Sequence, residues 1–289
     1  MTNQNMTFEK SLKPAAVEEW LDVVFYRKLA HKLVPLFIKL KFSPNMISGL
    51  SLASGLLASL FVFHEHFWAS ALCMVMAIIF DCSDGQVARL TGNKNPFGRI
   101  IDGVFDMIWI VSFWILLDRS PYFTKHPIPH ITLLMSTAGF FFVVHCWRYD
   151  GVKIKYLERV QPGYSDKDLD LSQIRVLLKE EWKKKNILTC FLCVCMAFQM
   201  YFFVRGKHQK TSIFPSLEQQ EEARLNLTPV MRLWSWLGES HHNTLMILGI
   251  LLAPWTPAGL LFVFFYITIP LNFLWIVSEW KWKKLYKNM

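Results

Sequence analysis

The chain has 289 residues, of which 53% are hydrophobic and 15% aromatic, and its formal net charge is +9. This composition is too apolar for an ordinary soluble domain and predicts an all-α integral membrane protein. The positive charge does not indicate nucleic-acid binding, because the basic residues concentrate at the ends of apolar segments. Anionic lipid and cytoplasmic orientation account for them there.

The first 43 residues are predicted to form an amphipathic segment at the membrane interface, ahead of a transmembrane domain over 44–289. Within this segment, residues 14–42 have the pattern of one helix. The apolar side carries Trp20, Leu21, Phe25, Leu29 and Leu33, and the polar side carries Arg27, Lys28 and Lys32. A surface helix of a soluble domain is the alternative, but a membrane span follows at once and favours the interface.

Apolar segments long enough to cross a bilayer follow one another along the rest of the chain. They are expected near 46–64, 67–90, 97–117, 130–148, 187–204 and 258–280, with a shorter run at 243–253. We expect about six transmembrane helices, and a partly interfacial or re-entrant region over 226–253. Small residues in the first span, Ser51, Gly55 and Ser59, predict close approach of a neighbouring helix.

A charged region over 150–186 follows the fourth span and is predicted to be cytoplasmic, with a helix from Leu171 to Trp182. Basic residues at the end of that span mark the cytoplasmic side, namely Arg148, Lys153, Lys155 and Arg159. Counting back through the spans places the amino terminus and the acidic stretch 81–106 at the same, cytoplasmic face. The predicted location is a bacterial inner membrane.

Four aspartates lie at the ends of the second and third predicted spans. On one helix, a single arc of about 140° holds Asp81, Asp84, Gly85, Ala88 and Arg89. On the next, Gly98, Asp102 and Asp106 recur every four residues along one stripe. A charged residue inside a span costs about 2.5 to 3.5 kcal/mol, so four together indicate function. An all-oxygen ligand set favours two Mg²⁺ or Mn²⁺ ions, and thus a phosphorylated substrate.

The stretch 81–106 resembles, without a gap, the signature of the CDP-alcohol phosphotransferase family, also called class I CDP-alcohol phosphatidyltransferases. The resemblance implies an enzyme of phospholipid synthesis. Such an enzyme transfers the phosphoryl-alcohol part of a CDP-alcohol to an acceptor hydroxyl and releases CMP. By the resemblance, Asp81, Asp84 and Asp102 hold one ion, and Asp81, Asp102 and Asp106 hold the second. Asp106 is also the implied general base, with a pure metal ligand as the alternative.

The resemblance also implies residues that bind the CDP donor. Gly85 and Arg89 match donor-contacting positions, and a planar guanidinium suits phosphate oxygens. A second donor-binding turn falls on Pro44, Asn45, Met46 and Ile47, where an ordinary helix start is equally expected. Asn95 stands where many relatives carry Ser or Thr, and its amide can still donate to phosphate.

The signature leaves the two substrates open. The compact chain favours CDP-diacylglycerol as donor with an alcohol acceptor, and a soluble CDP-alcohol with a diacylglycerol acceptor is the alternative. A phosphate on the acceptor would be read by Arg99, Arg148 and Lys153, although we prefer a purely topological role for these residues. A homodimer is compatible with the resemblance.

Three rival interpretations carry less weight. A transporter or cation channel would show matching broken helices in the two halves of the chain, and the sequence shows no such repeat. A non-catalytic lipid-binding protein would not need all four aspartates. Metal sites at His241 and His242, or at Cys190, Cys193 and Cys195, lack a full ligand set.

Overall fold

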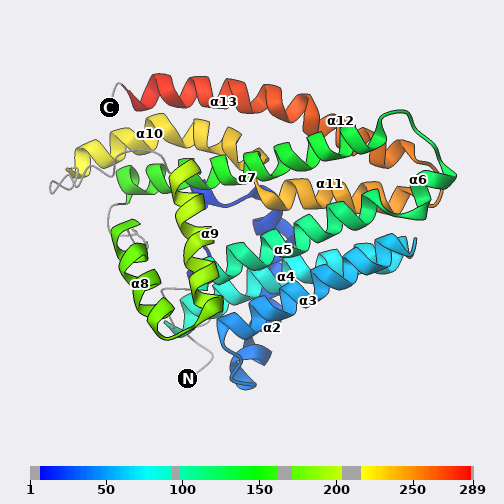
Figure 1. Ribbon diagram of the computed structural model, residues 1–289. Coiled ribbons are helices and arrows are strands. Elements are labelled where there is room, and N and C mark those ends of the chain that lie inside the picture. The colour runs from blue at the N-terminus through cyan, green and yellow to red at the C-terminus, as the bar shows by residue number, and fades with distance from the viewer. Residues whose placement is uncertain (1–6, 93–97, 162–170, 204–215, 288–289) are drawn as a thin grey trace.

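The structure is a computed structural model that describes residues 7–92, 98–161, 171–203 and 216–287 (Figure 1). Within these ranges the regular elements are all helices, which confirms the predicted fold class for that part of the chain. Asn95 lies outside the described residues, as does the side chain of Arg99.

The N-terminal segment is less regular than the sequence predicts. It contains α1 (Phe8–Ser11), a 3-10 turn η2 (Ala15–Val17), a π-helical turn η3 (Asp22–Tyr26) and α2 (Arg27–Lys39). A single helix over 14–42 is therefore wrong at its start. Pro14 precedes the 3-10 turn, and the backbone is extended at Glu18, with φ −89° and ψ 138°. This geometry lets the Glu18 carboxylate accept a hydrogen bond from the Lys13 amide at 2.6 Å.

Arg27 differs most from its predicted environment. The helical pattern assigns it to the polar face, but the residue is only 7% exposed. Its Nε lies 2.9 Å from a Glu18 carboxylate oxygen, and its Nη2 lies 3.6 Å from one of Asp22. These carboxylates come from outside α2, so the period of the helix does not reveal them. Trp20, at 58% exposed, remains on the surface as expected.

Three helices that run alongside one another form the part of the molecule that carries the aspartates (Figure 1). They are α3 (Pro44–Phe63), α4 (Phe67–Thr91) and α5 (Gly98–Asp118). Ser43 caps α3 by accepting a hydrogen bond from the Met46 amide at 3.3 Å. The predicted close approach is confirmed, because Ser51 donates to the Ala77 carbonyl of α4 at 2.9 Å.

The remaining helices cover this trio and extend the bundle. In chain order they are α6 (Pro121–Lys125), α7 (Ile131–Val160), α8 (Leu171–Lys183), α9 (Ile187–Phe203), α10 (Leu217–Trp234), η5 (Ser235–Leu237), α11 (Glu239–Leu252), α12 (Ala258–Thr268) and α13 (Pro270–Tyr286). Helix α8 confirms the helix predicted from Leu171. Figure 1 shows α9 crossing the long helices at one end of the bundle.

Four helical stretches of the described chain are long and apolar enough to cross a membrane. These are α3, α4, α7 and the stretch Ala258–Tyr286 that contains α12 and α13. The protein is therefore a multi-pass membrane protein. The expected total of about six spans stays a prediction.

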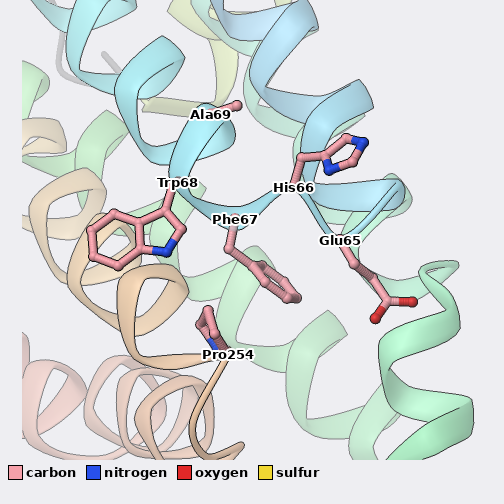
Figure 2. Close-up of a pocket in the computed structure, with 6 residues that line it drawn as sticks. All are labelled: Glu65, His66, Phe67, Trp68, Ala69 and Pro254. Atoms are coloured by element: carbon pink, nitrogen blue, oxygen red, sulfur yellow. The ribbon is translucent and has the colours of Figure 1, made fainter.

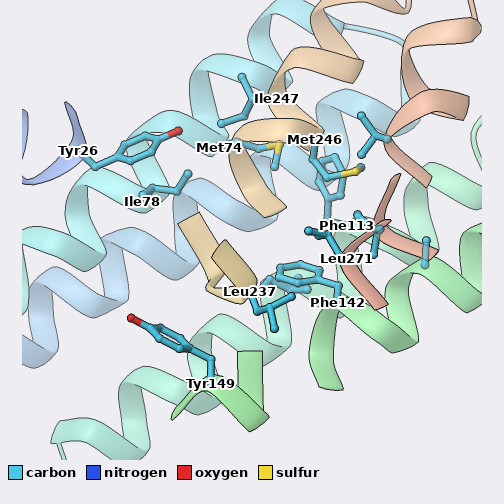
Figure 3. Packing of buried hydrophobic residues seen from close by; sticks show 14 of the residues in the cluster. Tyr26, Met74, Ile78, Phe113, Phe142, Tyr149, Leu237, Met246, Ile247 and Leu271 are labelled. Carbon is cyan, nitrogen blue, oxygen red and sulfur yellow. The ribbon is translucent and has the colours of Figure 1, made fainter. Parts of the chain in front are cut away.

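One large core joins the N-terminal segment to the transmembrane helices. Tyr26, Met74, Phe142, Met246 and Leu271 all belong to this cluster, although they come from five separate parts of the chain (Figure 3). The Tyr26 hydroxyl also hydrogen-bonds the Thr244 hydroxyl of α11 at 2.9 Å. Burial of this apolar surface fixes α11 and the N-terminal segment beside α4.

Candidate active site

Helices α4 and α5 bring three of the predicted acids together. One carboxylate oxygen from each of Asp81, Asp102 and Asp106 lies within 4.8 Å of the others. Asp102 and Asp106 are one helical turn apart, so both project from the same face of α5. This trio is the group that the resemblance assigns to the second ion. Like charges this close repel, and a divalent cation would relieve the repulsion.

Asp84 lies beside this trio but outside it. Its carboxylate interacts electrostatically with Asp102 and Asp81. It also accepts a hydrogen bond of 2.5 Å from the Ser48 hydroxyl of α3. The sequence does not single out Ser48, because a serine near a helix start has many ordinary roles. This hydrogen bond holds the Asp84 side chain, which lies about one helical turn after Asp81 on α4.

Asp106 is held by a neighbour on its own helix. The Trp109 indole N–H donates to its carboxylate at 3.3 Å. Trp109 in turn lies against Gly55 of α3, where a Cβ atom would come within 2.4 Å of the indole ring. The absence of a side chain at Gly55 therefore positions the group that orients Asp106.

Arg89 lies one turn beyond Gly85 and folds back over it. A Cβ atom at Gly85 would meet the Arg89 guanidinium at 3.2 Å. The Arg89 Nε donates to the Ser11 carbonyl of the N-terminal segment at 2.6 Å. The structure thus brings both predicted donor-binding residues together at the end of α4 that carries the aspartates.

The second predicted donor turn forms the start of α3. Pro44 occupies the first position of this helix, and Asn45 is half-buried beside it. Met46 is exposed, whereas Ile47 is fully buried against Val34, Phe37 and Val87. The Ile47 side chain therefore has a packing role.

A group of charged residues from the N-terminal segment lies next to the aspartates. Burial disfavours the charged form of Glu18, but Arg27 and Lys13 outweigh burial and lower the pKa of its carboxyl. Burial raises the pKa of Glu19 well above its usual value, and repulsion by Asp22 adds to the effect. Lys153, burial and Arg27 together lower the pKa of Lys13 to about 8.

Glu239 is a further acid near the aspartates that the signature does not contain. It is the first residue of α11, and it interacts electrostatically with Asp102, Asp106 and Asp81. Motif spacing gives no signal for it, because it follows Asp106 by more than a hundred residues. The one signal for Glu239 in the sequence is a charged residue at the start of an apolar stretch. By sequence alone this residue is only a break in the apolar pattern.

The other polar candidates have structural partners. Arg148 forms an ion pair with Glu279 of α13 at 2.7 Å, and Lys153 forms one with Asp150. His242 contacts His145 across helices, with 3.2 Å between ring nitrogens. Among the described residues, the group that could hold a metal ion consists of aspartates alone, without histidine or cysteine. All six cysteines are free.

An open pocket lies at the other end of α4 (Figure 2). It is lined by Glu65, His66, Phe67, Trp68, Ala69 and Pro254. Helical rise separates Phe67 from Asp81 by about 21 Å. Trp68 packs edge-to-face against Trp255 there. This pocket is therefore separate from the acid cluster.

Comparison with known proteins agrees with this geometry. The family model for CDP-alcohol phosphatidyltransferase matches residues 41–157, which contain all four aspartates. An archaetidylserine synthase from Methanothermobacter thermautotrophicus is 36% identical over 67 residues, covering 22% of this chain and 29% of that protein. An uncharacterised protein from Aquifex aeolicus is 32% identical over 82 residues, covering 28% of this chain and 42% of that protein.

Each of these matches covers less than half the length of the curated relative. No solved structure matches the chain. The family match and the gathered aspartates coincide in α4 and α5, and the archaetidylserine synthase fits the same family. Residues 41–157 of the chain therefore match the CDP-alcohol phosphatidyltransferase family.

Proposed function

We propose that the protein transfers a phosphatidyl group from CDP-diacylglycerol to the hydroxyl of an alcohol and releases CMP. The observation that carries this proposal is the group formed by Asp81, Asp102 and Asp106 inside the family-matched region. A relative whose name assigns it the synthesis of a serine-containing lipid supports a role in lipid synthesis. The product would be a membrane phospholipid.

The residues present fit divalent cations. Three carboxylates with oxygens within 4.8 Å of one another form an all-oxygen ligand set, which suits Mg²⁺ or Mn²⁺. Asp81, Asp102 and Asp106 would hold one ion. Asp84, next to Asp81 and Asp102, would complete a second site. Bound ions would supply positive charge to the pyrophosphate of the donor.

Asp106 is proposed as the general base. The acceptor oxygen forms a bond to the phosphorus of the phosphatidyl group, the phosphorus–oxygen bond to CMP breaks, and the hydroxyl proton moves to the Asp106 carboxylate. Trp109 supports this role by holding one carboxylate oxygen through its indole N–H. The other oxygen stays available for the ion or the acceptor.

Arg89 and Gly85 are proposed to bind the donor. A planar guanidinium donates paired hydrogen bonds to phosphate, and Gly85 leaves its surface open to a ligand. The backbone at Pro44 and Asn45, with the Asn95 amide, would contact the nucleotide part. We place the site at the cytoplasmic face of a bacterial inner membrane, because basic residues cluster at the same ends of the spans.

Release of CMP tests the proposal. Purified protein in detergent or liposomes would be incubated with Mg²⁺, CDP-diacylglycerol and serine, ethanolamine, choline, glycerol 3-phosphate or inositol phosphate. We expect CMP and a new phospholipid with at least one acceptor. A parallel reaction would contain CDP-choline and diacylglycerol. CMP formed only in that reaction would reverse the assignment of donor and acceptor, and no CMP in any reaction would contradict the proposal.

A further inference from the structure

Helix α9 takes a different course from the helices that run along the bundle. None of its 17 residues is charged, and the sequence therefore predicts a membrane span here. In the structure, however, α9 crosses the long helices instead of running beside them, and it contacts α5 and α7 (Figure 1). The Phe198 ring lies 6.4 Å from the Trp147 ring of α7. The neighbouring helices therefore have to show where α9 lies in the membrane.

Helices α7 and α10, which precede and follow the pair α8 and α9, meet at the same end of the bundle. Helix α7 ends at Val160. Near that end, the Tyr156 hydroxyl forms a hydrogen bond with the Thr228 hydroxyl of α10 at 2.7 Å. Further along α10, Arg232 donates to the Glu18 carbonyl of the N-terminal segment at 3.3 Å. A single crossing by α9 would have put α10 at the opposite end of the bundle.

The helices that follow α10 cross the bundle and return without α9. Helix α11 begins beside Glu19 of the N-terminal segment. It ends near α6 at the opposite end, where the Tyr122 hydroxyl donates to the Ala253 carbonyl at 2.9 Å. Helix α13 leads back, because Glu279 pairs with Arg148 of α7 at 2.7 Å. These two passes already form a complete pair, so α9 is not needed as a crossing.

Helix α9 has a protein-facing side and an outward side. Cys190 and Cys193 are buried, and the Cys190 sulfur lies 4.0 Å from the Leu178 carbonyl of α8. The outward side carries four large apolar side chains, each more than half exposed, which form the apolar stripe: Ile187, Phe191, Val194 and Phe198. At the helical period these four lie within one arc of about 60°. Such a stripe indicates hydrocarbon or an apolar partner, because exposing it to water costs free energy.

The charges next to the stripe favour a lipid leaflet as its partner. Residues 171–186 carry five cationic and two acidic side chains. Three of the cationic residues, Lys183, Lys184 and Lys185, are exposed where α8 gives way to α9, beside the exposed Trp182. Lysine attracts anionic headgroups, and tryptophan prefers the membrane interface. An apolar face flanked by lysine and tryptophan is typical of a helix that lies in the interface.

We propose that α9 lies in the plane of the membrane and binds the acyl chains of one leaflet through the apolar stripe. The leaflet is the one at the end of the bundle where α7 ends. Helix α8 lies beside the anionic headgroups of the same leaflet. Residues 187–203 are then an interfacial docking surface, and α11 takes their place among the membrane crossings.

Labelling of native lysines tests whether α9 crosses the membrane. Inside-out and right-side-out vesicles from the expression host would be treated with a membrane-impermeant amine reagent, and mass spectrometry would identify the modified residues. Lys183 and Lys185 precede α9, Lys207 and Lys210 follow it, and Lys125 of α6 marks the opposite end. We expect all four lysines around α9 to react in one kind of vesicle and Lys125 in the other. Reaction of Lys207 or Lys210 together with Lys125 would overturn the proposal.

Electron paramagnetic resonance tests the position of the apolar stripe. A nitroxide would be attached to Ile187→Cys or Phe198→Cys, with the six native cysteines replaced by alanine. The protein would be reconstituted in vesicles of phosphatidylcholine and phosphatidylglycerol. Met46→Cys and Leu57→Cys are the matched controls, because both residues are exposed on the candidate span α3 and have the same separation in sequence.

The expected depths differ between the two helices. This separation corresponds to about 16 Å along a helix, so the two labels on α3 should differ in depth by about that distance. The two labels on α9 should lie at the same depth to within about 5 Å, one helical turn. Both should react more readily with oxygen than with a water-soluble nickel complex.

Three results would overturn the proposal. A depth difference on α9 equal to that on α3 would make α9 a membrane span. Free access of the nickel complex to both labels would place the stripe in water. Dipolar broadening between labels on two molecules would make a second copy of the chain the partner of the stripe. If the cysteine-free protein does not fold, lysine labelling of the wild type still decides whether α9 crosses.

Discussion

Two neighbouring groups of charged residues in this protein are built in opposite ways. In the N-terminal segment, Arg27 is buried between the carboxylates of Glu18 and Asp22, so unlike charges meet. Between α4 and α5, Asp81, Asp102 and Asp106 gather carboxylates of the same sign. In the first arrangement a cation of the same chain faces the carboxylates, whereas the second needs a cation from outside the chain.

This difference separates stability from function. Removing one member of a buried ion pair leaves an uncompensated charge, so we expect variants of the N-terminal group to unfold more easily. Removing one of several like charges relieves repulsion, so variants of the aspartate group should fold at least as well as the wild type and lose activity. The predictions below test each half of this contrast.

The largest effect is expected for Asp106→Asn. The amide keeps the shape of the side chain but removes the proposed base and an ion ligand. CMP release should fall by about 10³-fold, while the melting temperature in detergent should stay equal to that of the wild type or rise.

Asp118→Asn, on the same helix but at its far end, is the control for this variant and should keep wild-type activity. Full activity of Asp106→Asn would contradict the assigned role. A large drop in its melting temperature would contradict the contrast between the two charged groups.

Arg27→Met should have the largest effect on stability. It leaves Glu18 and Asp22 buried without their cation. In comparable cases this lowers the free energy of unfolding by about 3 to 5 kcal/mol. Denaturant unfolding in detergent measures this loss. Arg224→Met is the matched control, because Arg224 pairs with Glu221 at 3.6 Å on the surface. Its expected cost is below about 1 kcal/mol, and equal costs for both variants would show that burial does not matter here.

Gly55→Ala should have a smaller effect that links the fold to the site. The new methyl group would meet the Trp109 ring at about 2.4 Å, so Trp109 must move away from Asp106. We expect the free energy of unfolding to fall by about 1 to 3 kcal/mol and the rate of CMP release to decrease. Gly49→Ala, on the same helix with no atom within 4 Å of the added carbon, is the control. Identical behaviour of the two variants would contradict the role of this contact.

The smallest effect is expected from the pH dependence of Lys13. Lys153, burial and Arg27 lower its pKa from the ordinary 10.5 to about 8 in the folded protein. The unfolded chain then binds more protons between about pH 8 and 10.5, so the contribution of Lys13 to stability rises with pH in this window. The melting temperature of the wild type should therefore gain on that of Lys13→Met as pH rises. A constant difference would show that Lys13 has an ordinary pKa when folded.

The sequence predicts that the aspartates of α4 and α5 lie together, because that signal is local. Asp81 and Asp84 share a helix face by their spacing, and Asp102 and Asp106 share the next. The short connection between the two helices leaves few ways to arrange these faces. The small residues Ser51, Gly55 and Ser59 likewise predict close contact with a neighbouring helix, because small residues at helical spacing let two helices approach.

The surroundings of the site depend on contacts between distant parts of the chain. Glu18 and Arg27 meet because the backbone is extended after a 3-10 turn, which helical periodicity does not show. Glu239 reaches the aspartates only when α11 packs on α4, and no spacing rule connects residues so far apart. The positions of Glu18, Arg27 and Glu239 thus depend on tertiary packing, whereas the helical period alone predicts which aspartates share a face.

Binding of Mn²⁺ followed by electron paramagnetic resonance tests the central claim most directly, because it needs neither substrate nor activity. The account predicts saturable binding to the wild-type protein in detergent. Binding should weaken at least tenfold in Asp102→Asn and stay unchanged in Asp118→Asn. Equal binding by the wild type and Asp102→Asn, or no saturable binding at all, would contradict the claim that α4 and α5 gather their carboxylates to hold a divalent ion.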